Sequence, residues 1–85
     1  MSMKYIIFMT PELYKIPIIF PETISHADMA QKMGKSYEVV SAGQFNCSEV
    51  YVYGDSITLS KNLNKEIKSL PEDVKLIEHA LNSYL

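Results

Sequence analysis

The chain has 85 residues, of which 47% are hydrophobic and 21% are charged, and its formal net charge is −2. This length allows one domain over residues 1–85, and the composition is that of a globular chain rather than a disordered one. All eight basic residues are lysines. Because arginine is the residue best suited to reading guanine and phosphate, its absence disfavours a nucleic-acid partner.

Cysteine content and hydropathy indicate where the protein acts. Cys47 is the only cysteine, so no internal disulfide is possible, which is typical of a reducing compartment. No apolar run is long enough to span a bilayer, and the N-terminal segment lacks the apolar core of a secretory signal. We therefore expect a cytoplasmic protein with no membrane contact. Met1 and Ser2 are interpreted as an addition before a natural start at Met3.

Two strands are predicted first. Residues 4–10 (KYIIFMT) are rich in β-forming side chains and end at Pro11, and residues 14–20 (YKIPIIF) form the antiparallel return. Because Pro17 cannot donate a backbone hydrogen bond, the second strand is expected at an edge of the sheet.

Two helices are predicted from their end signals. Ser25 and Asp28 have the spacing of an N-terminal cap, and Gly34 is a typical C-terminal stop. The second helix begins near Ser69 and Glu72, which have capping-box spacing. Its apolar positions recur on one helical face: Leu70, Val74, Ile77, Leu81 and Tyr84.

Two further strands lie between these helices. They are predicted over residues 37–45 (YEVVSAGQF) and 49–59 (EVYVYGDSITL), with a turn at residues 46–48. Residues 60–69 are polar and are predicted to form a loop or one helical turn. The element order is therefore ββαββα. The simplest fold of this order is a single α+β domain, an antiparallel sheet with both helices packed on one face.

The tripeptide Gly54-Asp55-Ser56 follows a predicted strand and resembles the opening block of the GDS-type esterases and lipases. In that family the serine, here Ser56, is the nucleophile, and a downstream Asp-x-x-His supplies the base. The only downstream histidine is His79, and Leu76 stands three residues before it in place of aspartate. Since nucleophilic catalysis needs that base and a group to orient it, we expect no catalytic residues and no enzyme activity.

A metal site is also disfavoured. His26 and Asp28 are close in sequence, but zinc takes three or four ligands and Cys47 is the only thiol. Helix capping is the favoured role for this segment, and we expect neither a metal nor a cofactor.

Four stretches in matching order resemble a family of short phage and prophage proteins: residues 17–30 (PIIFPETISHADMA), 39–45 (VVSAGQF), 53–60 (YGDSITLS) and 69–81 (SLPEDVKLIEHAL). The family pattern is an FP…HA helix, a VSAGF strand, a GxSxSL strand and an SxPxDxxLI helix. This chain departs from the pattern at Val39 and at Leu70, where proline and arginine are usual. The resemblance implies a phage or mobile-element origin but no catalytic residue. Small proteins of that origin often bind host machinery, including defence systems.

The aromatic residues of the two later strands are candidates for a binding surface. Tyr51 and Tyr53 alternate with valines, so the two kinds of side chain lie on opposite faces. If the valines face the helices, the tyrosines lie on the open face of the sheet; the alternative is that the aromatic residues form the core. The interface candidates are Tyr37, Phe45, Tyr51, Tyr53 and Asp55.

These features lead to three functional hypotheses. The first is a non-enzymatic binding protein of the phage type that acts on a host or phage protein, such as a defence system, and that forms a homodimer through Tyr51 and Tyr53, because their strand has no edge protection. The second is an oligomeric sponge for a nucleotide-like ligand, with candidate contacts at Lys35, Ser41, Gln44 and Asp55. The third is an esterase with Ser56 as nucleophile.

Overall fold

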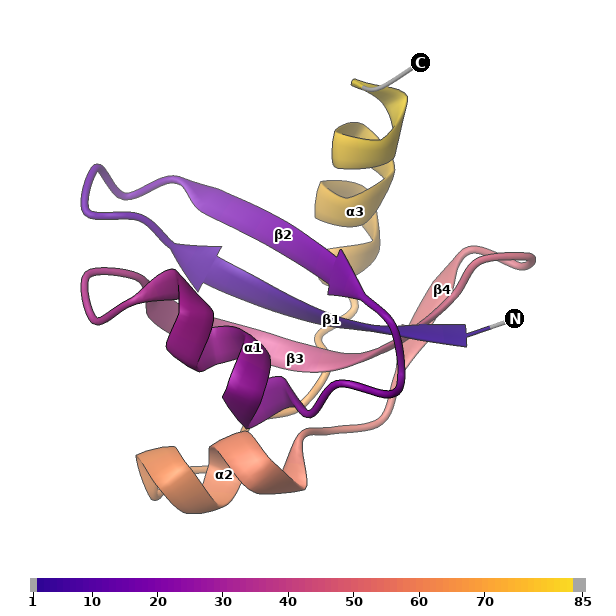
Figure 1. Ribbon diagram of the computed structural model, residues 1–85. Helices are drawn as coiled ribbons and strands as arrows, with labels where there is room; N and C mark the ends of the chain where they lie inside the picture. Colours follow the sequence, from indigo (N-terminus) through magenta and orange to yellow (C-terminus); the bar gives the residue numbers. More distant parts are fainter. Residues whose placement is uncertain (1, 84–85) are drawn as a thin grey trace.

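The computed structural model describes residues 2–83, which form a four-stranded antiparallel sheet in the order β2-β1-β3-β4 (Figure 1). The strands are β1 (Ser2–Met9), β2 (Lys15–Phe20), β3 (Glu38–Asn46) and β4 (Tyr51–Tyr53). The helices are α1 (His26–Met33), α2 (Ile57–Leu63) and α3 (Asp73–Asn82). The predicted α+β class and the order ββαββα are confirmed, with α2 as an additional short helix.

Strand β1 lies in the middle of the hydrophobic core. Four consecutive side chains, Tyr5 to Phe8, are fully buried. Because neighbouring side chains of a strand point to opposite faces, this run requires cover on both faces of the sheet. Burial of each such side chain contributes about 1.5–3 kcal/mol. Strand β2 lies outside β1 at the sheet edge, as Pro17 predicts.

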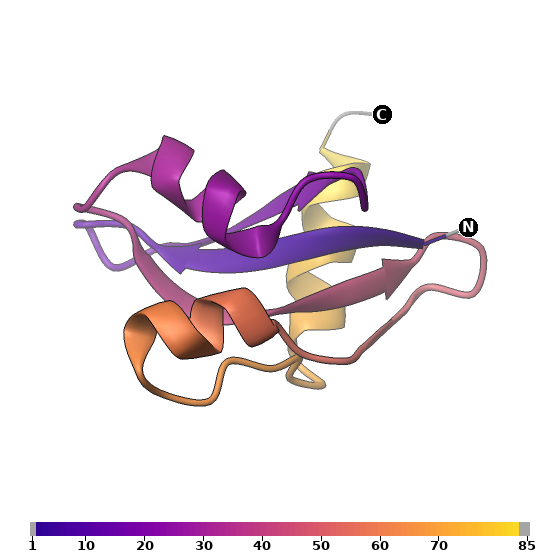
Figure 2. The same cartoon turned by 60° about the horizontal axis from the view of Figure 1, so that its bottom comes forward.

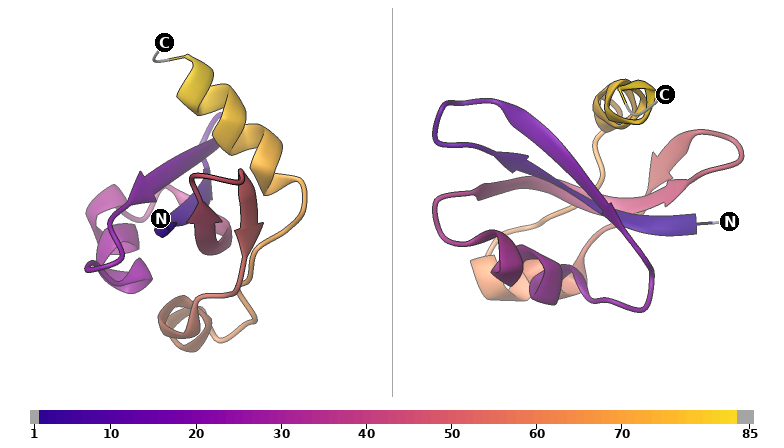
Figure 3. Two further views of the ribbon diagram at one scale, coloured as in Figure 1. Left: turned by 90° about the vertical axis from the view of Figure 1, so that its right-hand side faces the viewer. Right: turned by 45° about the horizontal axis from the view of Figure 1, so that its top comes forward.

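The helices cover the two faces of the sheet unequally (Figures 2 and 3). Helices α1 and α2 pack on one face, whose core residues include Ile6, Phe8, Val39, Leu59 and Ile67. Helix α3 packs on the opposite face, whose buried cluster is Tyr5, Ile7, Phe45 and Ile77. The two helices that share a face are therefore α1 and α2. The prediction that the C-terminal helix packs on the same face of the sheet as α1 is wrong. Alternate side chains of β1 point to the opposite face, and α3 buries them there.

A β-bulge in β3 changes which of its residues face each helix. Ile7 pairs with Ser41, whereas the next residue, Phe8, pairs with Val39, so Val40 has no partner on β1. The extra residue reverses the alternation of side chains along β3. An odd-numbered residue before the bulge and an odd-numbered residue after it consequently lie on opposite faces of the sheet.

The strand predicted over residues 49–59 is much shorter in the structure. Strand β4 has only three residues, and Gly54 after it adopts φ 78°, a left-handed conformation that glycine tolerates. Ser56 then caps α2, because its Oγ accepts a hydrogen bond from the N–H of Leu59 at 3.2 Å. The tripeptide before α2 is therefore a turn and a helix cap.

The polar segment predicted as a loop or one turn, residues 60–69, begins inside α2. The helix ends at Asn64, which adopts φ 55°, a conformation that asparagine tolerates better than most residues. Beyond it, the Oγ of Ser60 accepts a hydrogen bond from the N–H of Ile67 at 2.9 Å. Ile67 is 2% exposed and joins the core beneath α1 and α2. The segment is therefore tied to the sheet by this buried side chain and by the hydrogen bond from the N–H of Ala42 to the carbonyl of Lys68 at 3.3 Å.

Helix α1 begins and ends where its sequence signals predict. The Oγ of Ser25 accepts a hydrogen bond from the N–H of Asp28 at 3.1 Å, and Gly34 follows the last turn with φ 86°. The ammonium group of Lys4 donates to the carbonyl of Ile24 at 2.9 Å. This bond ties the start of α1 to β1.

The start of α3 is held by a different pair from the one predicted. Ser69 and Glu72 do not cap it. Instead, the N–H of Leu70 donates to the Oδ2 of Asp73 at 3.0 Å, and the N–H of Asp73 donates to the carbonyl of Leu70 at 2.9 Å. The capping pair thus lies one residue later along the chain than the predicted pair. Asp73 is 2% exposed, and its carboxylate reaches back over the first turn.

The predicted apolar face of α3 is only partly used. Ile77 is fully buried, and Leu76 packs against the same cluster. Leu81 is 42% exposed, because the last turn extends past the sheet (Figure 1). Tyr84 lies outside the described residues.

Candidate functional site

The turn between β3 and β4 is held by its own hydrogen bonds. The Oδ1 of Asn46 accepts from the N–H groups of Ser48 and Glu49 at 3.0 and 2.9 Å, which confirms the predicted turn chemistry. Val50 donates its N–H to the carbonyl of Asn46 at 2.9 Å and adopts φ 56°. A left-handed conformation is costly for a β-branched residue. The turn therefore fixes Val50, which is 40% exposed, just before β4.

Two tyrosines follow on the edge strand. The rings of Tyr51 and Tyr53 lie 5.5 Å apart between centroids, and they are 43% and 39% exposed. The hydroxyls of Tyr53 and Ser2 are hydrogen-bonded at 2.8 Å. Figures 1 and 2 show this hairpin projecting past α1 and α2. We call the exposed surface of Val50, Tyr51 and Tyr53 the tyrosine edge.

The other three predicted interface residues lie elsewhere. Tyr37 is half-buried and meets the ring of Phe8 edge-on at 6.4 Å. Phe45 is 2% exposed in the cluster beneath α3, so its predicted place on an open sheet face is wrong. Phe45 pairs with Val52 and shares its face, opposite to Tyr51 and Tyr53, and the β3 bulge puts Tyr37 and Phe45 on opposite faces. Asp55 is exposed and forms an isolated bridge with Lys68.

A second exposed apolar surface lies at the opposite end of the sheet, on the turn between β1 and β2 (Figure 1). Leu13 is 78% exposed and Tyr14 is 69% exposed. We call this pair the hairpin tip. Leu13 adopts φ 69°, an uncommon conformation for leucine.

Thr10 holds the hairpin tip in place. Its N–H donates to the carbonyl of Tyr14 at 2.8 Å, its carbonyl accepts from the N–H of Leu13 at 2.9 Å, and its Oγ1 accepts from the N–H of Tyr14 at 3.1 Å. The strand predicted over residues 14–20 included Tyr14, but β2 begins at Lys15, and the exposure of Leu13 and Tyr14 was not predicted. The signal in the sequence that could have indicated this exposure was a pair of large apolar residues at the connection between two strands.

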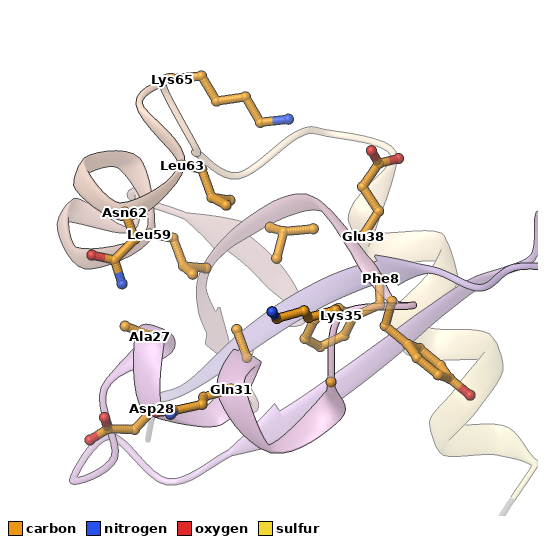
Figure 4. A pocket seen from close by; sticks show the side chains of 14 residues that line it. Phe8, Ala27, Asp28, Gln31, Lys35, Glu38, Leu59, Asn62, Leu63 and Lys65 are labelled. Carbon is orange, nitrogen blue, oxygen red and sulfur yellow. The ribbon is translucent and has the colours of Figure 1, made fainter.

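A groove between α1 and α2 has a volume of about 940 Å³ (Figure 4). Its floor includes Phe8, Val39 and Leu59, each less than 10% exposed, so the floor offers little apolar surface to a ligand. Lys35 and Lys65 extend from the loops after α1 and α2. Both lysines follow helix C-termini, whose partial negative charge they offset.

The four contacts predicted for a small-ligand sponge are dispersed. Lys35 lines the groove between α1 and α2, whereas Asp55 lines a separate groove beside α2. Ser41 is 1% exposed, and its Oγ has no hydrogen-bond partner. The side chain of Gln44 lies against the backbone of Gly54.

Ser56 does not have the surroundings of a nucleophile. It is 1% exposed, and its Oγ is engaged as the cap of α2. His79 is exposed on α3, which covers the opposite face of the sheet. The buried histidine, His26, donates from Nε2 to the carbonyl of Gly43 at 3.0 Å. These groups hold the fold together and do not form a nucleophile–base pair.

His26 is nevertheless an unusual buried polar group. It is 4% exposed, and its ring meets that of Phe20 edge-on at 5.5 Å. Burial lowers the pKa of the imidazole, and the nearby Lys4 lowers it further, while the bond to Gly43 and the charge of Asp55 oppose this shift. The imidazole is therefore held neutral, as a packing and hydrogen-bonding group.

Across residues 2–83, no group of three or more His, Cys, Asp or Glu side chains is placed to hold a metal ion. None of the helices in this part of the chain has the length and apolar character to cross a membrane. The chain matches no family model, no curated protein and no solved structure significantly. Large apolar residues are also exposed singly on α2 and α3, but within residues 2–83 they adjoin in sequence only at the tyrosine edge and the hairpin tip, which are the main candidates for function.

Proposed function

We propose that this chain is a small non-enzymatic binding protein of the phage type, which acts in the bacterial cytoplasm by contact with a host protein, such as a component of a defence system. The phage assignment is supported by the ordered motifs between residues 17 and 81. Action by contact with a protein is supported by the two exposed apolar surfaces, the tyrosine edge and the hairpin tip, because neither lines a pocket with catalytic groups.

The hairpin tip is the observation that carries the proposal. Leu13 and Tyr14 are the two most exposed large apolar residues of those described. A backbone held by three hydrogen bonds to Thr10 has little freedom left to lose on binding, and pre-organisation of this kind raises affinity. Tyrosine is also a residue that often dominates binding energy at interfaces. The tip is convex, so it fits an apolar pocket on the partner.

The second part of the proposal is a homodimer, with Tyr51 and Tyr53 at the interface. Val52 packs against the cluster beneath α3, so Tyr51 and Tyr53 lie on the other face of the sheet. The homodimer is supported by the adjacent, partly exposed tyrosines on an edge strand, whose rings are tilted by 41° to each other. The two surfaces lie at opposite ends of the sheet (Figure 2), so self-association leaves the hairpin tips free.

A phage plating assay tests the host-contact function. The chain is expressed in bacteria that carry individual restriction, CRISPR or other defence systems, and each strain is challenged with a phage that its system restricts. We expect the wild-type chain to raise the plating efficiency on one of these hosts above that of the same host without the chain. No rise on any host would overturn the counter-defence role.

Variants of the hairpin tip locate the contact. Leu13→Asn suits the left-handed conformation, and Tyr14→Ser removes the exposed ring, so both leave the fold intact. Both are expected to lose the rise in plating. The matched control is Ile57→Ser, which removes another large side chain that is 66% exposed, on α2. Retained activity in both tip variants would show that the contact lies elsewhere.

A further inference from the structure

We infer that the homodimer forms by antiparallel pairing of β4 with β4 of a second copy, which joins the two sheets into one. The inference rests on the homodimer proposed above and adds its geometry. In the expected register, Val52 lies opposite Val52 of the second copy, and Tyr51 lies opposite the second copy's Tyr53.

The two edges of the sheet differ in how they are protected. Strand β2 carries Lys15 and Pro17, and both residue types discourage the addition of another strand. Strand β4 consists of Tyr51, Val52 and Tyr53 and carries neither residue type, so its one protection is its short length. Its sequence is instead one that favours strand pairing, since β-branched and aromatic residues pair well across strands.

On the side of the sheet where β4 lies, another backbone segment covers part of β3. Strand β4 is the part of this side that remains open. The carbonyl of Lys68 accepts a hydrogen bond from the N–H of Ala42 at 3.3 Å, so the earlier half of β3 already has a neighbour there. After β4, the chain turns at Gly54 and pairs Asp55 with Lys68. The available edge is therefore three residues long and is centred on Val52.

This short edge is complementary to itself. Antiparallel pairing about Val52 keeps the two tyrosines of each copy on one face, because side chains alternate along a strand. The existing pair of rings, 5.5 Å apart, would then extend into a cluster of four. An isologous contact of this kind closes after two copies, which makes a dimer and not a fibre.

The area involved indicates a weak dimer. A tyrosine buries about 150–250 Å² in total, so exposure near 40% leaves roughly 60–100 Å² per ring for the interface. Four rings supply about 240–400 Å², well below the roughly 1,200 Å² of a stable standard interface. We therefore expect a weak, transient dimer that appears only towards high micromolar concentration.

Sedimentation velocity and amide hydrogen exchange, both measured from low to high micromolar concentration, test the inference. The mass is expected to rise towards twice 9.7 kDa. Exchange at the β4 amides that point away from β3 is expected to slow in step with it. Tyr51→Lys places a charge on the edge and is expected to raise the dissociation constant about tenfold or more. The matched control, Tyr14→Lys at the hairpin tip, is expected to leave it unchanged.

The possible failures are distinguishable. A chain that stays monomeric at high micromolar concentration overturns the dimer, while the host-contact function is judged separately by plating. A dimer whose β4 exchange does not slow overturns strand pairing and retains the homodimer. A dimer that Tyr51→Lys does not weaken overturns the placement of the interface at β4.

Discussion

The hydroxyl of Tyr5 donates a 2.6 Å hydrogen bond to the Oδ2 of Asp73, and both side chains are buried. This bond joins the central strand β1 to the first turn of α3, and the same oxygen accepts the N–H of Leu70. Burial raises the pKa of the Tyr5 phenol, and the bond to Asp73 raises it further. The phenol therefore stays protonated and remains the donor.

Removing this donor is expected to destabilise the protein. Tyr5→Phe leaves the Oδ2 of Asp73 buried with one hydrogen bond fewer, at a cost of about 1–3 kcal/mol in the free energy of unfolding. Urea denaturation measures the change. The control is Tyr53→Phe, which removes a hydroxyl on the surface and is expected to cost less than about 0.5 kcal/mol. Equal costs for the two variants would mean that the buried bond contributes nothing specific.

Stability is expected to fall on mild acidification because of His26. Its pKa in the folded state is lowered from the usual value of 6.5, so the unfolded chain takes up a proton first as the pH decreases. Since the unfolded state then binds more protons, the contribution of His26 is complete above about pH 6.5 and is lost progressively below it. Urea denaturation between about pH 7 and pH 5 measures this slope.

Two histidine variants assign the slope to a residue. His26→Gln keeps an N–H donor for the carbonyl of Gly43 but does not titrate, so the slope is expected to flatten. His79→Gln changes an exposed histidine on α3 and is expected to retain the wild-type slope. The idea fails if the two variants show the same pH dependence.

Ser56 is expected to matter for stability and not for ester cleavage. Ser56→Ala removes the cap of α2 at Leu59, which costs about 1 kcal/mol. Any background ester hydrolysis is expected to be the same in the variant and the wild type. Ser36→Ala is the control, because Ser36 is exposed, and its cost is expected to lie within about 0.5 kcal/mol. Ester cleavage that disappears with Ser56 would restore the nucleophile hypothesis.

Gly43 is expected to tolerate no larger residue. A Cβ atom at this position would lie 2.6 Å from the carbonyl oxygen of Tyr53 and 3.0 Å from the Cβ of Ser69. Since a backbone atom cannot move aside cheaply, Gly43→Ala is expected to cost about 1–3 kcal/mol. Thermal denaturation measures the loss. An unchanged Tm would contradict the close approach of β4 to β3.

Several elements followed from local sequence because their signals are local. The first hairpin is marked by β-forming residues and Pro11, and the edge position of β2 by a missing backbone donor at Pro17. Helix α1 is marked by Ser25 and Gly34. Each signal acts within a few residues of the structure that it specifies, so a single sequence is enough to find it.

The candidate surfaces were only partly predictable. Tyr51 and Tyr53 were identified from strand alternation, and both are exposed. Phe45 was misplaced because its face depends on how β3 aligns with β4, where it pairs with Val52 and not with a tyrosine. The exposure of Leu13 and Tyr14 was missed because it depends on how Thr10 closes the turn.

Sequence alone thus determined the class of the fold, the order of its main elements and the edge position of β2. Tertiary structure decided which face each helix covers, where β4 ends and which aromatic residues stay exposed. The physical reason is the separation of the partners. The bond from Tyr5 to Asp73 spans 68 residues, and the bulge in β3 exists only in its pairing with β1. Contacts of this range leave no periodic trace in either segment, so they appear only when the segments pack together.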